Sequence, residues 1–106
     1  MSELEKLTAE IKLATDYQIN KRILREKIQT DLHVPYNGGL FKVTPELIMF
    51  ANTQTLNENF YLEDTYQNPI HIIKPMEFAR LCMEQYQKVM NTWHQQHEEL
   101  KKIRRV

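Results

Sequence analysis

Two histidines and a glutamate near the end of the sequence have the spacing of a metal site. His94 and His97 are three residues apart, and Glu98 follows His94 by four. On a helix these positions share one face, so both imidazoles and the carboxylate could reach one zinc ion. A complete zinc site needs a third or fourth ligand, and here only the distant His33 or His71 offers one. We keep His94 and His97 as metal candidates, but favour two histidines on a solvated helix face and no cofactor.

The other reactive residue types do not combine into a catalytic arrangement. Cys82 is the only cysteine and lies on an apolar helical stripe, where a buried structural thiol is expected rather than a nucleophile. Ser2 is the only serine, which removes serine hydrolase chemistry. Glu63 and Asp64 are adjacent, and neighbouring side chains of a strand point to opposite faces. We therefore expect a protein that is not an enzyme.

Two clusters of basic residues could contact phosphate groups. If the helices that carry them are antiparallel, the two clusters lie far apart and form no continuous stripe. The whole chain holds 14 basic and 14 acidic residues, and a zero net charge is unusual for a protein that coats nucleic acid. A nucleic-acid-associated regulator remains an alternative function. Its candidate residues are Lys101, Lys102, Arg104 and Arg105, with Lys21, Arg22, Arg25 and Lys27 as the second cluster.

Length and composition predict one globular domain that covers residues 1–106. Hydrophobic residues make up 42% of the 106 residues and charged residues 26%, which is typical of a folded domain. A single cysteine fits a reducing compartment, and the polar N-terminal residues do not resemble a signal peptide. No apolar run approaches the roughly 18 residues of a membrane span. We expect a cytoplasmic protein without a membrane partner.

Glycine and proline divide the chain into three parts. Both glycines and all four prolines lie between Pro35 and Pro75, and an uninterrupted run of about thirty residues flanks them on each side. This pattern predicts an α+β, mainly α fold, in which two long antiparallel helices flank a small strand–helix–β-hairpin middle. The expected parts are a long helix in 1–34, the middle in 35–73 and a second long helix in 74–106.

The middle contains its own start and stop signals. Residues 34–39 predict a turn that ends the first helix, and residues 40–43 predict a strand. Thr44-Pro45-Glu46 reads as a helix start, with a capping hydroxyl, a proline at the first helical position and an acid behind it. Two apolar runs, residues 60–64 and 70–73, flank an Asn-Pro turn and predict a β-hairpin.

The two long helices carry matching apolar stripes. The last helix has a coiled-coil-like spacing of three and four residues, and the first has one that includes Leu4, Leu7 and Ile11. An antiparallel pair of equal reach would place Leu7 opposite Leu100, Leu24 opposite Met83 and Ile28 opposite Ala79. Pairing between two chains would give the same pattern, so the sequence leaves both arrangements open.

Several short strings resemble small uncharacterised proteins of large tailed bacteriophages. They are residues 37–39, 41–48, 62–66, 68–70, 90–91 and 93–94. The resemblance implies a setting in the host cytoplasm or a virion, and it carries over no residue-level function. The helix–middle–helix outline is also similar to prefoldin-type chaperones, although the helix predicted after Thr44-Pro45 departs from that outline.

The function that the sequence favours is a non-enzymatic protein-interaction or assembly protein. The resemblance implies a phage structural or accessory protein, or a host-takeover factor. Long apolar stripes, an acidic middle and a basic tail support assembly with a protein partner or with a second copy. The middle supplies aromatic and acidic side chains for recognition. The candidate interaction residues are Phe60, Tyr61, Glu63, Asp64 and Tyr66.

Overall fold

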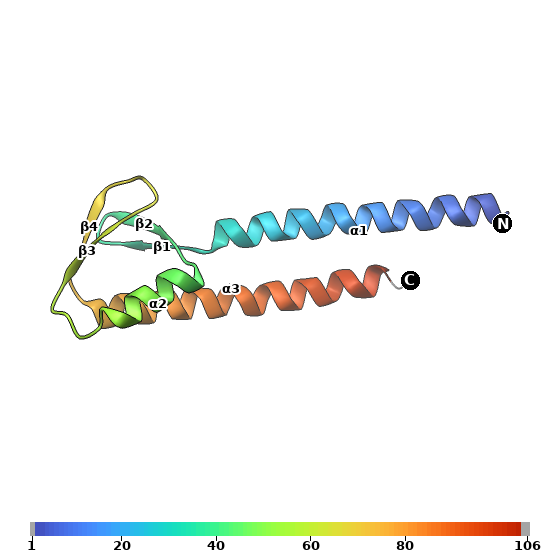
Figure 1. The fold of residues 1–106 in the computed structure, drawn as a ribbon. Coiled ribbons are helices and arrows are strands. Elements are labelled where there is room, and N and C mark those ends of the chain that lie inside the picture. Colours follow the sequence, from blue (N-terminus) through green and yellow to red (C-terminus); the bar gives the residue numbers. More distant parts are fainter. Residues whose placement is uncertain (1, 105–106) are drawn as a thin grey trace.

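The computed structural model describes residues 2–104, with side chains through Lys102, and has the predicted α+β, mainly helical architecture. Figure 1 shows two long helices running side by side from a small mixed head. The molecule is elongated, with extents of 70 × 23 × 17 Å. In chain order the elements are α1 (Glu3–Asp31), β1 (His33–Tyr36), β2 (Gly39–Lys42), α2 (Pro45–Thr53), β3 (Phe60–Glu63), β4 (Pro69–Ile72) and α3 (Pro75–Arg104).

Local signals in the sequence explain where the first two helices begin. The Ser2 hydroxyl accepts a hydrogen bond from the backbone N–H of Glu5, and the Glu5 carboxylate accepts one from the backbone N–H of Ser2, so the two residues form a capping box. Thr44 caps α2 through the backbone N–H of Leu47, at 3.1 Å, and Pro45 takes the first helical position as predicted.

The head contains two separate antiparallel hairpins, one more than the sequence predicted. The turn expected at residues 34–39 is in fact the strand β1 and its connection to β2. Asn37 and Gly38 both have positive φ, 45° and 83°, which is the geometry of the tight two-residue turn that Asn-Gly favours. Pro35 concealed the strand because it lacks an N–H, but a two-stranded sheet has only edge strands and edges tolerate proline. The hairpin of β3 and β4 lies where it was predicted.

Phe78, at the start of α3, is the centre of the head core. Its fully buried ring meets Tyr36 and Phe41 edge to face, each at a centroid distance of 5.2 Å, and Phe60 at 6.4 Å. Aromatic pairs prefer this geometry over direct stacking. The first turns of α3 are therefore part of the head, and both hairpins and α2 pack around them.

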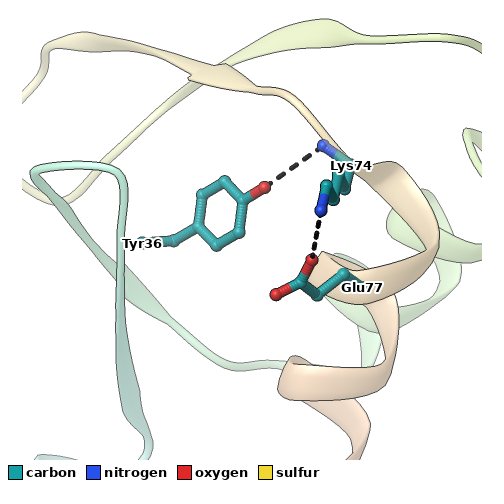
Figure 2. A network of polar contacts seen from close by, with 3 residues as sticks. All are labelled: Tyr36, Lys74 and Glu77. Carbon is teal, nitrogen blue, oxygen red and sulfur yellow. Dashed lines mark hydrogen bonds and ion pairs between the residues drawn. The ribbon is translucent and has the colours of Figure 1, made fainter.

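Tyr36 also fixes the first hairpin to the beginning of α3 through its hydroxyl group. The backbone N–H of Lys74 donates to the Tyr36 hydroxyl at 3.2 Å, and the Lys74 ammonium lies 4.0 Å from the carboxylate of Glu77 (Figure 2). Both charged side chains are exposed, so the ion pair adds little stability. The Tyr36 hydrogen bond and the Tyr36–Phe78 ring contact join the two elements.

α1 and α3 pair antiparallel within the chain, but the predicted register is wrong. Ile28 packs with Val89 rather than with Ala79, and Gln85 donates to the carbonyl of Asp31 at 2.9 Å. The shift from position 79 to position 89 is about 15 Å of helix. Because the head lies beside the first turns of α3, Ala79 packs in the head core and α1 meets only the later turns.

Candidate interaction surfaces

The hairpin of β3 and β4 divides the predicted interaction residues between two faces. Phe60 points inward, against Phe50 and Phe78. Tyr61 points outward and its ring stacks on His71, with centroids 4.7 Å apart. Glu63 and Tyr66 are also exposed. Of the five predicted residues, only Tyr61, Glu63 and Tyr66 offer exposed side chains to a partner.

Asp64 is a brace between the two hairpins rather than an exposed recognition residue. It is only 7% exposed, and its carboxylate accepts hydrogen bonds from the backbone of Leu40 at 3.2 Å, Tyr66 at 3.0 Å and Asn68 at 2.9 Å. The N–H of Asn68, with those of Leu40 and Tyr66, outweighs burial and lowers the pKa of Asp64 below its usual 3.8. The side chain is fully engaged, so it drops out of the interaction candidates.

Gly39 allows the two hairpins to approach one another, a role that the sequence analysis missed. A Cβ atom at this position would lie 2.5 Å from Cγ1 of Ile70, well inside contact distance. The same junction includes the bond from the Thr65 N–H to the Leu40 carbonyl, at 2.9 Å. The only sign of this role in the sequence is the second glycine of the Gly38-Gly39 pair. The reason that a glycine is needed there is the contact with Ile70, which lies 31 residues later in the sequence.

The shifted register leaves the N-terminal part of α1 without a helical neighbour in the described part of the chain. Figure 1 shows α1 continuing beyond the end of α3. Residues 3–12, here called the overhang, are all exposed, and the first half-buried residue is Leu13. The overhang still carries an apolar stripe, because Leu4, Leu7 and Ile11 are 73%, 53% and 59% exposed. Large apolar side chains at helical spacing on an exposed helix are typical of a binding surface.

A groove between α1 and α3 begins at Lys21, about two and a half helical turns after the overhang ends. The shift brings the middle of α1 beside the last third of α3, so the two basic clusters are closer than the sequence analysis expected. Of the C-terminal cluster, Lys101 is one helical turn from His97. The side chain of Arg104 and all of Arg105 lie outside the described part of the chain. We call this surface the basic groove, and it is lined by Lys21, Arg25, Met90, Trp93, His94 and His97.

The two histidines of the basic groove do not gather further ligands. Among the described residues, no group of three His, Cys, Asp or Glu side chains is placed to hold a metal ion. Glu98 instead accepts a hydrogen bond from Lys101 at 3.2 Å, and this contact lowers the pKa of the carboxylate. His33 bonds to the Thr30 carbonyl near the head.

Cys82 is buried in the head core, as predicted for a structural thiol. Burial raises the pKa of the thiol to about 11. Because the thiolate is the reactive form, a raised pKa makes the folded protein a poor nucleophile at neutral pH.

Across the described residues, no helix combines the length and apolar character that a bilayer crossing requires.

Comparisons with known proteins add no relative to these observations. Neither a protein-family model, nor a curated protein, nor a solved structure matches this chain.

Proposed function

We propose that this chain is a non-enzymatic interaction protein that assembles with a protein partner or with a second copy through the overhang of α1. The observation that carries the proposal is the stripe of Leu4, Leu7 and Ile11 on a helix segment that has no helical neighbour among residues 2–104. The exposed hairpin residues Tyr61, Glu63 and Tyr66 offer a second contact surface at the opposite end. The resemblance to small phage proteins adds the host cytoplasm or a virion as the setting.

Covering exposed apolar side chains at an interface lowers the free energy of the assembled state. Covering a leucine or isoleucine contributes about 1.5–3 kcal/mol relative to leaving it in water. A short helix also gains most of its stability from packing, so ten residues without a neighbour are weakly held on their own. A partner that covers the stripe therefore stabilises both the apolar side chains and the helix that carries them.

The test replaces the apolar residues of the stripe with polar ones and leaves both core clusters unchanged. We expect the triple variant L4Q/L7Q/I11Q to keep the circular dichroism and the melting temperature of the head, because these residues contribute nothing to either core cluster. Its assembly, measured by light scattering and by pull-down from the native host, is expected to weaken by about a hundredfold or more.

A matched variant controls for the general effect of replacing exposed apolar residues. Met49, Leu56 and Met76 are at least as exposed as Ile11 but lie at the head end. M49Q/L56Q/M76Q should assemble like the original protein. A strictly monomeric protein that captures no partner, or equal assembly by both triple variants, would count against the proposal.

The second candidate function is binding of nucleic acid. The observation that favours it is the register shift, which places Lys21 and Arg25 beside His94 and His97 and close to Lys101. Phosphate contacts by these side chains would be strongly salt dependent. Fluorescence anisotropy with a labelled oligonucleotide tests this candidate, and no binding at low salt removes it.

A further inference from the structure

We propose that the partner of the overhang is a second copy of this chain, and that each copy lays its overhang into the basic groove of the other. This inference rests on the proposed function and names the partner. It predicts an antiparallel two-fold dimer in which the two helical ends overlap and the two heads point away from each other.

The overhang has the chemistry of an acidic amphipathic helix. Glu3 is four residues before Leu7 and Glu10 is three residues after it, so both carboxylates lie beside the apolar stripe on the same face. Residues 3–12 hold three glutamates and two lysines, which leaves an excess of one negative charge. A surface that accepts this helix needs an apolar floor and cationic edges.

The basic groove has that combination. Met90 and Trp93 are half-buried apolar side chains of the groove, and Lys21 and Arg25 stand exposed on α1 beside them. His94 and His97 line the α3 side of the groove. The groove on the other side of the two helices is lined by both Lys27 and Glu99, so its edges carry mixed charge.

Helix geometry places the overhang stripe and the basic groove on the same side of α1. Arg25 follows Leu7 by 18 residues, and Lys21 follows Glu3 by the same number. Eighteen residues are about five complete turns at roughly 3.6 residues each, so each pair projects in the same direction. A single two-fold axis facing that side can then seat both overhangs in both grooves at once, which a closed dimer requires.

The experiment exchanges charges between the two surfaces and measures dimer dissociation by sedimentation equilibrium. E3K/E10K makes the overhang cationic, and K21E/R25E makes the basic groove anionic. Each variant alone should dissociate more than about tenfold more readily than the original protein, because like charges then meet at both contacts. An equimolar mixture of the two variants restores opposite charges at both contacts, so it should form a heterodimer with an affinity within about threefold of the original.

A charge exchange on the other side of α1 provides the control. Asp16 and Lys27 are exposed and point away from the stripe and the basic groove, so D16K/K27E should dimerise like the original protein. A monomeric original protein, or a dimer that E3K/E10K and K21E/R25E leave unchanged, overturns the inference. In that case the proposed function still stands if L4Q/L7Q/I11Q loses a partner that M49Q/L56Q/M76Q retains, and it falls if neither variant loses one.

Discussion

Asp64 has a structural role in place of the recognition role that was predicted for it. A carboxylate that accepts three backbone hydrogen bonds at one junction holds the turn after β3 and also ties it to β2. The sequence suggested an acidic recognition residue, since strand alternation and charge were the only available signals. Its real role depends on the packing of two hairpins, which no local pattern contains.

This role makes the stability of the protein depend on pH through Asp64. The folded pKa lies below the usual 3.8, so the carboxylate contributes stability that is complete above that unfolded value and is lost as pH falls through the folded pKa. We expect D64N to unfold at lower urea concentration at pH 7 and to lose less further stability between pH 5 and pH 3 than the original protein. E63Q, which changes the exposed neighbouring carboxylate, is the control. Equal pH dependence in D64N and the original would contradict the brace.

At the scale of elements, the sequence predicted the helices well and their register badly. The ends of α1 and α3 follow from the proline and glycine pattern and from the cap at Ser2, because those signals are local. The register depends on where the head sits, which is set by Phe78 and its neighbours in three dimensions. An apolar stripe also does not reveal which of its members have a neighbour, so Leu7 looked like a core residue.

Gln96 is a polar defect in the interface between α1 and α3. Its side-chain carbonyl is buried, and in the described part of the chain it has no hydrogen-bond partner. Because a buried polar group without a partner is costly, Q96L should raise the free energy of unfolding by about 1 kcal/mol in urea titrations. Q95L changes an exposed neighbour and should have little effect. A Q96L protein no more stable than Q95L would mean that the carbonyl is satisfied in solution.

At the scale of the whole molecule, α1 and α3 have similar lengths but are offset along their axes. The molecule is therefore a rod in which α1 continues beyond the end of α3 (Figure 1). The head has its own core, and α3 is covered by α1 along its later turns. The overhang is left with an apolar stripe that Glu3 and Glu10 flank on one side, and the basic groove lies further along the same helix. Sequence reasoning found the two basic clusters and the stripe, but only the offset places them at one end.

The most direct test of this account is amide hydrogen exchange of the original protein at a low and a high protein concentration. The amide protons of residues 3–12 are expected to exchange rapidly in dilute solution and to become protected at high concentration, because the second copy then covers the overhang. Residues 78–82, which include Phe78, Ala79 and Cys82 of the head core, should exchange equally slowly at both concentrations. Exchange of residues 3–12 that does not change with protein concentration would contradict the account.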